Sequence, residues 1–428
     1  MQTNSTAAPP TENVINNRSA MAVVTTLFFM WGFLTSLNDI LIPHLKAIFE
    51  LNYAQAMLVQ FSFFSAYFLF SVPSGKLIDA IGYKRAMVSG LATMSVGAML
   101  FIPAANIASF PLFLFALMVL ASGITILQVS ANPYVAVLGR PETASSRLNL
   151  TQGFNSVGHT IAPYIGGLLI LGAAGARAAT SGSLQAIRAQ EAATVKLPYV
   201  ILSVTLAALA VMIGLSRLPR IAAEHAGGDD TSFAQLLHHK RLVLGVIGIF
   251  LYVGAEVAIG SFLVNYFTQH EIGDLPQKVA ASYVSLYWGG AMVGRFIGSA
   301  LLQKIRAPKL LAFNAVVACA LVVVSMLSSG HVAMWSILAV GLFNSVMFPS
   351  IFTIAIEGLG PLTSKASGAL VTAIVGGAVI PLTQGALADR IGVHHAFILP
   401  ALCYVFVFFY ALQGFRTTAP LAAPPVPD

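Results

Sequence analysis

Long apolar stretches separated by short polar segments run along the chain from Ala20 to Arg416. Each stretch is close to the roughly 20 residues that an α-helix needs to cross a bilayer. The pattern therefore predicts an all-α membrane protein with twelve spans. Their expected bounds are 20–45, 53–76, 84–105, 109–137, 149–172, 197–216, 241–267, 278–302, 309–328, 331–356, 364–388 and 395–415.

Composition excludes the soluble alternatives. Hydrophobic residues make up 57% of the 428 residues and charged residues only 9%, against roughly 25% charged residues in soluble proteins. So few charges cannot cover a soluble surface, which excludes a soluble enzyme, a disordered protein and a disulfide scaffold. Cys319 and Cys403 lie in apolar runs and form neither a disulfide framework nor a metal-ligand pattern.

Lys and Arg residues predict the orientation of the spans. With a cytoplasmic N-terminus, most of them fall in cytoplasmic segments, as the positive-inside rule requires. Both termini are therefore expected in the cytoplasm, and the net charge of +7 needs no nucleic-acid partner. The basic residues expected in the outer segments are Lys46, Arg177, Arg188, Lys196, Lys278 and Arg390.

The spans divide into two groups of six, separated by the longest cytoplasmic connection. We expect a disordered cytoplasmic tail at 1–19, an N-terminal six-helix bundle at 20–217, a cytoplasmic linker at 218–240, a C-terminal six-helix bundle at 241–416 and a cytoplasmic tail at 417–428. His238 and His239 in the linker are expected to be solvated, with a metal site as the alternative. The long outer loop at 173–196 carries no motif.

Polar and proline positions repeat between the two halves. A shift of about 217 residues, read from the sequence, places Gln128 on Asn344, Pro133 on Pro349, Pro163 on Pro381 and Asp39 on Glu256. Such a repeat indicates two bundles related by an axis along the membrane normal. Because proline frees a backbone carbonyl and permits bending, the four prolines are expected to be flexible points around one central cavity.

Several segments carry a resemblance to a known family. The connection Gly75-Lys-Leu-Ile-Asp79-Ala-Ile-Gly82-Tyr-Lys84-Arg85 resembles the signature loop of the major facilitator superfamily, with Ala80 in place of Arg. Further segments are similar to the bacterial fucose–galactose–glucose symporter family. They are Leu37-Asn38-Asp39-Ile40-Leu41, Ala131-Asn132-Pro133-Tyr134, Arg147–Gly158 and Tyr252-Val-Gly-Ala-Glu256.

The resemblance implies a twelve-helix major facilitator fold in a bacterial inner membrane and cation-coupled import of a monosaccharide. In the fucose branch a second acid stands where this chain has Gln128, and an amide stands where it has Glu256. The pattern is therefore more similar to the glucose/galactose/mannose or N-acetylglucosamine branches. The expected partners are the sugar and the bilayer, with no cofactor and a monomeric protein. A drug exporter of the same fold is the alternative.

Ionisable groups deep in the spans are the candidates for coupling, because each costs at least about 2.5–3.5 kcal/mol in the bilayer. Asp39 is the first choice, since a carboxyl group in a cavity can load and release a proton. Glu256 is the second and would carry the cation or accept sugar hydroxyls. Two ionised carboxylates beside Asn and Thr oxygens would also suit sodium. Proton and sodium both stay open as the coupling ion.

Amide side chains suit a sugar because each both donates and accepts hydrogen bonds. Hydrogen bonding between helices is the alternative role for them and for His159. The expected substrate-binding residues are Asn38, Gln128, Gln152, Asn155, His159, Trp288, Asn344 and Gln384. The expected gating or conformational residues are Asp79, Lys84, Arg85, Arg295, Pro133, Pro163, Pro349 and Pro381.

Overall fold

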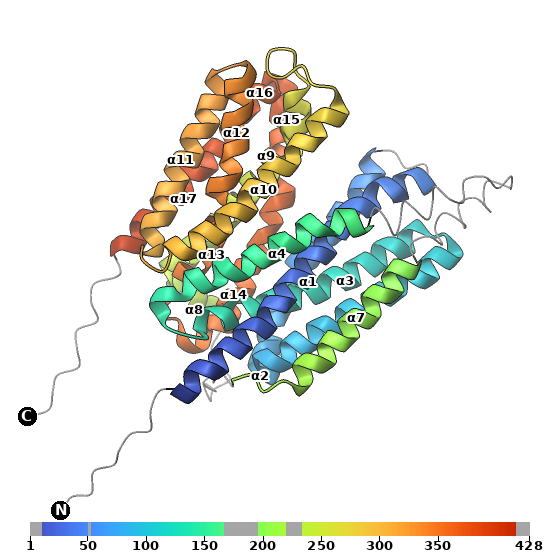
Figure 1. The fold of residues 1–428 in the computed structure, drawn as a ribbon, viewed down its shortest axis with the longest axis vertical. Coiled ribbons are helices and arrows are strands. Elements are labelled where there is room, and N and C mark those ends of the chain that lie inside the picture. The colour runs from blue at the N-terminus through green and yellow to red at the C-terminus, as the bar shows by residue number, and fades with distance from the viewer. Residues whose placement is uncertain (1–10, 50–52, 167–195, 220–232, 417–428) are drawn as a thin grey trace, which may run out of the picture.

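The computed structural model describes residues 11–49, 53–166, 196–219 and 233–416 (Figure 1). Within these ranges the chain forms helices and turns and no strand, so the predicted all-α class is confirmed. The first half contains α1 (Thr11–Phe49), α2 (Tyr53–Ile107), α3 (Phe110–Val137), the 3-10 turn η1 (Pro141–Thr143), α4 (Ala144–Gly166) and α7 (Lys196–Leu215).

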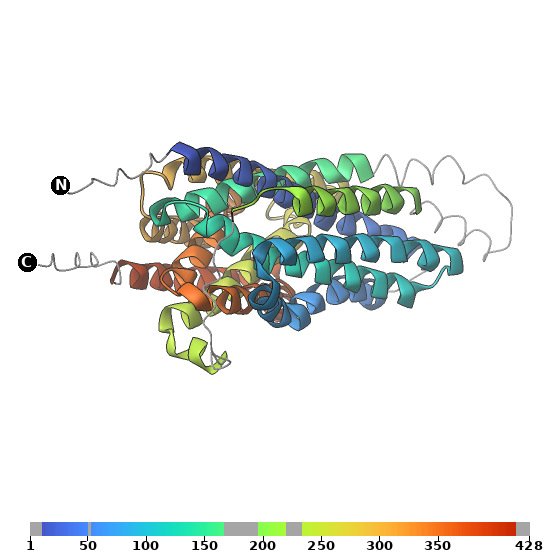
Figure 2. The same ribbon diagram turned by 90° about the horizontal axis from the view of Figure 1, so that it is seen from below.

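The second half begins after the short helix α8 (Phe233–His238). It contains α9 (Lys240–Phe267), α10 (Gln277–Leu301), α11 (Ala307–Leu327), α12 (Gly330–Asn344), α13 (Met347–Ile356), α14 (Thr363–Thr372), α15 (Gly376–Ile391), α16 (Val393–Ala396) and α17 (Ile398–Arg416), with the 3-10 turns η3 (Gly360–Leu362) and η4 (Ala373–Val375). The two halves form separate bundles, and both chain ends extend from the same end of the molecule (Figures 1 and 2).

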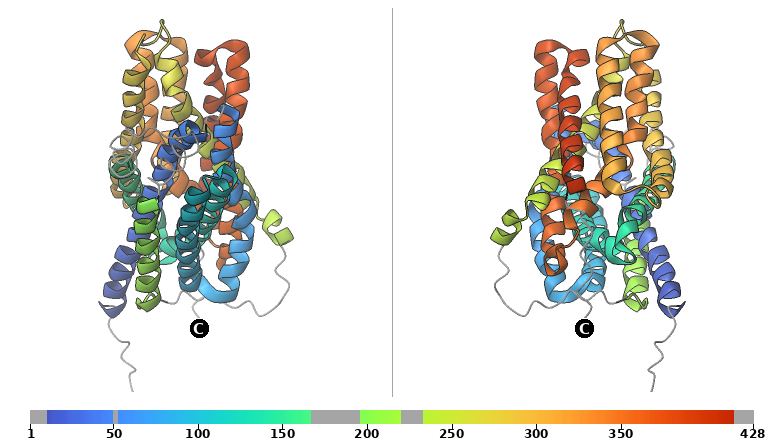
Figure 3. Two further views of the ribbon diagram at one scale, coloured as in Figure 1. Left: turned by 90° about the vertical axis from the view of Figure 1, so that its right-hand side faces the viewer. Right: turned by 90° about the vertical axis from the view of Figure 1, so that its left-hand side faces the viewer.

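Hydropathy separates two of the helices from the rest. Nine helical segments in the described ranges are long and apolar enough to cross a membrane, and one of them, Phe61–Ile107, has 47 residues. This segment changes direction at Gly82, whose φ of 79° and ψ of 162° are not helical (Figure 3). It therefore supplies two spans. The remaining spans of the twelve-helix fold are α4 and α10, which lie outside this apolar set because polar side chains interrupt them.

The structure corrects several predicted bounds. Helix α1 begins at Thr11, so residues 11–19 are helical and do not belong to a disordered tail. The predicted tenth span breaks between Asn344 and Met347 into α12 and α13. The predicted eleventh span is α14 and α15 joined by η4. Residues 1–10, most of the outer loop 173–196 and the tail 417–428 lie outside the described residues.

The repeat predicted from the sequence recurs as a backbone contact. A Cβ atom added to Gly158 of α4 would collide with the Phe29 carbonyl of α1, and one added to Gly376 of α15 would collide with the Phe250 carbonyl of α9. Only glycine lets these helices approach so closely. The first and fifth spans of each half therefore cross in the same way.

Candidate functional site

The two bundles meet along a seam at the end of the molecule that carries both termini (Figure 1). One side of the seam joins α4 to α10 and α13. Ser146 Oγ donates to the Ser299 carbonyl at 2.7 Å, and Ser299 Oγ donates to the Ser146 carbonyl at 3.1 Å. The hydroxyls of Ser145 and Thr353 also bond to each other. These short side chains let the helices pack closely.

The other side of the seam joins α2 and α3 to α14. Asp79 accepts a hydrogen bond from Ser364 Oγ, and its Oδ2 lies 3.9 Å from Lys365 Nζ. Ser367 Oγ donates to the Val129 carbonyl at 2.8 Å. Asp79 thus lies at the N-terminus of α14, where the helix dipole favours a negative charge. Asp79 therefore contacts the opposite bundle, and its gating role stays a prediction.

Glu256 and Arg295 form an ion pair inside the C-terminal bundle. Arg295 Nη2 of α10 lies 3.8 Å from Glu256 Oε1 of α9, and both side chains are mostly buried. Arg295 Nη1 also donates to Ser156 Oγ of α4, in the other bundle. The predicted coupling acid and the predicted gating residue are therefore neighbours, which the sequence alone did not indicate.

Matching amide–tyrosine pairs lie in the two bundles. Gln128 Nε2 of α3 donates to the Tyr67 hydroxyl of α2 at 2.6 Å, and Asn344 Nδ2 of α12 donates to the Tyr287 hydroxyl of α10 at 2.8 Å. Within the described residues, Gln128 Oε1 and Asn344 Oδ1 are buried and have no hydrogen-bond partner. Each half thus holds one amide by its nitrogen and leaves its buried acceptor oxygen without a hydrogen-bond partner among the described residues.

The other predicted sugar-binding residues have different surroundings. Asn155 Nδ2 donates to the Phe28 carbonyl of α1 at 2.9 Å, which is the interhelical role given as its alternative. Gln152 is buried and His159 is half-buried on the same helix. Gln384 of α15 is 0% exposed, and neither of its amide atoms has a partner among the described residues. Trp288 is 41% exposed and packs beside Gly260.

Some predictions fall on residues whose side chains are not described. Asn38 and Asp39 lie in α1, and Pro163 lies in α4, but their side chains are outside the described residues. The coupling role of Asp39 therefore stays a prediction.

Of the predicted basic gating residues, Arg295 contacts the other bundle, whereas Lys84 bonds within its own. Lys84 Nζ donates to the carbonyls of Gly214 and Ser216, both at 2.8 Å, and so caps the end of α7 in its own bundle. Arg85 is exposed. Lys84 therefore stabilises the N-terminal bundle in this conformation.

Equivalent prolines affect the two halves differently. Helix α3 continues through Pro133, whereas the tenth span breaks just before Pro349. Pro381 lies inside α15, six residues after the end of the 3-10 segment η4. The irregular backbone is thus in the second half, and α3 shows no break at its matching proline.

A segment similar to the signature loop also lies at the C-terminal end of α15, and a comparison at a shift of 217 residues does not find it. The segment Gly385-Ala-Leu-Ala-Asp389-Arg390-Ile-Gly392 matches Gly75–Gly82 at its Gly, Leu, Asp, Ile and Gly positions. Gly392 has a φ of 83° and a ψ of 154°, close to the values of Gly82. A search at shifts other than 217 residues would have found it. Asp389 is exposed and makes no ion pair within the described residues.

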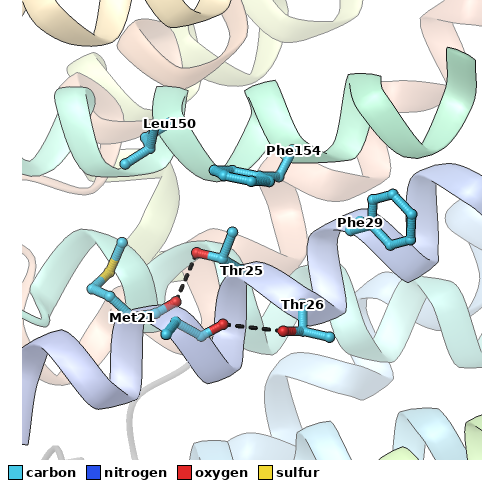
Figure 4. A pocket seen from close by; sticks show the side chains of 7 residues that line it. Met21, Thr25, Thr26, Phe29, Leu150 and Phe154 are labelled. Carbon is cyan, nitrogen blue, oxygen red and sulfur yellow. Dashed lines mark hydrogen bonds between the residues drawn. The ribbon is translucent and has the colours of Figure 1, made fainter.

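An apolar groove of about 500 Å³ lies between α1 and α4 (Figure 4). Thr25 and Thr26 line it, but their hydroxyls donate to the carbonyls of Met21 and Ala22 one turn earlier. Its other lining side chains include Phe29, Leu150 and Phe154. Because its lining is mostly apolar and both hydroxyl protons are already donated to carbonyls, this groove offers a sugar few hydrogen-bonding groups.

Comparison with known proteins agrees with this arrangement. Residues 23–380 match the family model described as Major Facilitator Superfamily. The chain is 51% identical to a glucose/galactose transporter of Brucella abortus (strain 9-941), over 97% of this chain and 98% of that protein. It is 33% identical to the L-fucose-proton symporter of Escherichia coli (strain K12), over 91% and 92% of the two chains.

A solved structure is similar over nearly the whole chain. The crystal structure of the major facilitator transporter FucP in the outward conformation matches with a TM-score of 0.86 and 32% identity, covering 94% of this chain and 100% of that one.

Proposed function

Because the chain belongs to the major facilitator superfamily, whose members are transporters and not enzymes, we propose that it imports glucose and galactose together with protons. Sugar transport by a multi-pass symporter of the inner membrane follows from its relatives. The choice of sugars rests on the 51% identity to a glucose/galactose transporter. The proton rests on the relatives described as proton symporters and on the surroundings of Glu256.

The observation that carries the proposal is the amide–tyrosine pair repeated in the two bundles. A pyranose offers hydroxyl groups in several directions, and each hydroxyl both donates and accepts hydrogen bonds. The open oxygens of Gln128 and Asn344 come from opposite halves. A sugar between them would contact both bundles, as alternating access requires. A drug exporter would instead favour a cavity poor in amides.

The surroundings of Glu256 favour a proton over sodium at this position. Arg295 lies 3.8 Å from the carboxylate, and its positive charge opposes binding of either cation, so the two ions differ here only in the ligands that they need. A proton neutralises Glu256 by binding a single carboxylate oxygen. A hard metal cation instead needs a set of several oxygen ligands around it. We therefore propose that Glu256 takes part in proton coupling, together with Asp39.

The closed seam supports an outward-facing assignment. Contacts between the bundles gather at the end that carries the termini, and the basic residues predict that this end is cytoplasmic. The similar FucP structure is described as outward. We propose that the protein works as a monomer whose two bundles rock about the sugar.

Counterflow in proteoliposomes tests the function. Labelled glucose, galactose, mannose, fucose and N-acetylglucosamine would be offered with an imposed proton or sodium gradient. We expect exchange of glucose and galactose, and their accumulation only with the proton gradient. Exchange of N-acetylglucosamine alone would move the substrate to that branch. No exchange of any sugar would contradict sugar import and favour the exporter alternative.

Asp39→Asn tests which acid couples transport. If Asp39 loads the proton, this variant keeps exchange and loses accumulation. Intact accumulation in Asp39→Asn would assign the coupling role to Glu256 alone.

A further inference from the structure

Arg295 contacts Glu256 in its own bundle and Ser156 in the opposite bundle. Its guanidinium group faces the Glu256 carboxylate with Nη2 and donates to Ser156 Oγ of α4 with Nη1. The 3.8 Å separation from Glu256 is an electrostatic contact, and Glu256 Oε1 has no hydrogen-bond partner within the described residues. A planar guanidinium with donors on both arms is suited to bridging two such partners.

Arg295 stands in the row of α10 residues that forms the seam. Its own carbonyl accepts a hydrogen bond from Asn149 Nδ2 of α4 at 2.7 Å. The next residue, Phe296, packs edge-to-face on Phe154 with ring centroids 5.7 Å apart. One turn further, Ser299 exchanges hydrogen bonds with Ser146. A displacement of the α10 backbone at Arg295 would therefore disturb the neighbouring contacts between α4 and α10.

The charge of Arg295 makes this contact depend on Glu256. The Arg295 side chain is only 15% exposed, and a buried charge that loses its counter-ion is strongly destabilising. The other titratable groups near the pair do not replace the carboxylate. Tyr252, Tyr287 and Tyr404 face Glu256 from α9, α10 and α17, and His159 of α4 faces Arg295. None of these four residues supplies a negative charge at neutral pH.

We propose that Arg295 is the positioning residue that links the charge of Glu256 to closure of the seam. Ionised Glu256 neutralises the guanidinium and lets it stay buried against Ser156. When Glu256 is neutral, Arg295 withdraws toward water and the seam weakens. The inference deepens the proposed function, on which it rests for the coupling role of Glu256. Proton loading from the open end would then prepare the opposite end to open.

A disulfide reporter across the seam measures its closure directly. The hydroxyl oxygens of Ser146 and Ser299 lie 3.4 Å apart, so cysteines at these positions come close enough for a disulfide. The rate of S146C/S299C cross-linking is measured in proteoliposomes with a mild oxidant. Single-cysteine variants account for the native Cys319 and Cys403.

We expect E256Q and R295K each to slow cross-linking about tenfold, the effect of losing one charge-assisted hydrogen bond. The double variant E256Q/R295K should be no slower than either single variant, because both remove the same link. S156A should also slow the reaction. The matched controls are E357Q and R241K, which break an ion pair at 3.2 Å inside the C-terminal bundle and should leave the rate unchanged.

Three results would overturn the inference. They are an unchanged or faster rate in E256Q, multiplied effects in the double variant, and equal slowing in E357Q. If E256Q does not fold, the cross-linking rate of S156A is measured instead, since this variant removes only a hydroxyl group. An unchanged rate in S156A would then contradict the inference. The cross-linking readout is independent of transport. A chain that exchanges no sugar but shows the expected rates would therefore refute the proposed function and leave the role of Arg295 supported.

Discussion

Gln128 and Asn344 place a side-chain amide at equivalent positions in the two halves. Each is held by a tyrosine hydroxyl from the second span of its own bundle. A tyrosine bonded in this way fixes the amide rotamer, so that the open oxygen keeps one direction. Pre-organised acceptors bind better because less side-chain freedom is lost on binding.

Tyr67→Phe and Tyr287→Phe test this arrangement at the scale of one residue. Each removes a single hydroxyl group and frees the amide. We expect the apparent affinity for sugar to fall about fivefold, equivalent to about 1 kcal/mol for one hydrogen bond, with little change in the maximum rate. Measurement of counterflow against sugar concentration checks this. Tyr199→Phe is the control, because Tyr199 stacks on Phe101 in the N-terminal bundle. An equal loss of affinity in this control would contradict the assignment.

Helix crossings place these residues at the element scale. Gly158 and Gly376 allow α4 and α15 to approach α1 and α9 so closely that a methyl group would collide with backbone. Side chains can move aside, but a helix backbone can yield only if the whole helix shifts. The two crossings therefore define the distance between the first and fifth spans of each half.

Gly158→Ala and Gly376→Ala should each lower the stability of the protein by about 1–3 kcal/mol, the usual cost of overpacking. The midpoint of thermal unfolding in detergent measures this. Gly289→Ala is the matched control in α10, where an added methyl group meets no atom within 4 Å. There the better helix propensity of alanine should leave the midpoint unchanged or raise it. Equal lowering in all three variants would contradict the crossing argument.

The two copies of the signature loop make a second element-scale prediction. Asp79 contacts the start of α14, whereas Asp389 makes no ion pair within the described ranges. Asp79→Asn should therefore slow cross-linking of S146C/S299C by about tenfold or more, in the range for hydrogen bonds to charged groups. Asp389→Asn, the same substitution in the same motif, should not slow it. The prediction fails if both variants behave alike.

The whole molecule has two bundles that are joined at one end, where α1 begins and α17 ends (Figure 1). The seam contains hydroxyl–hydroxyl, hydroxyl–carbonyl and amide–carbonyl contacts, which are individually weak. It also contains three contacts that involve a carboxylate or a guanidinium group: Asp79 with Ser364, Asp79 with Lys365, and Arg295 with Ser156. Such an interface can open and close without a large cost. Strong apolar packing between the bundles would hold them in one state.

Locking the seam should stop transport while leaving the sugar site accessible. The hydroxyl groups of Ser145 and Thr353 touch across it, so we expect a S145C/T353C disulfide to abolish both uptake and counterflow. Addition of a reducing agent should restore them. Binding of labelled sugar to the locked protein should persist, because the locked conformation is the one described. Full counterflow with a complete disulfide would contradict rocking of the two bundles.

Long apolar segments, the low share of charged residues and the two-half repeat were readable from the sequence because they are local or periodic features. The break before Pro349 was not, since Pro133 in an equivalent position leaves α3 continuous. Proline weakens a helix, but the neighbouring helices decide whether it breaks. In the same way, the sequence placed Lys84 in a gate, and the fold uses it to cap α7.

The sequence by itself determined the number of spans, the class of protein and the set of polar residues that enter the membrane. These follow from the cost of exposing polar groups to lipid, which applies to each helix separately. Only the tertiary structure decided the partners: Arg295 with Glu256 and Ser156, Gln128 with Tyr67, and Asp79 with α14. These pairs join residues far apart in the chain, so helix packing, and no periodic pattern, brings them together.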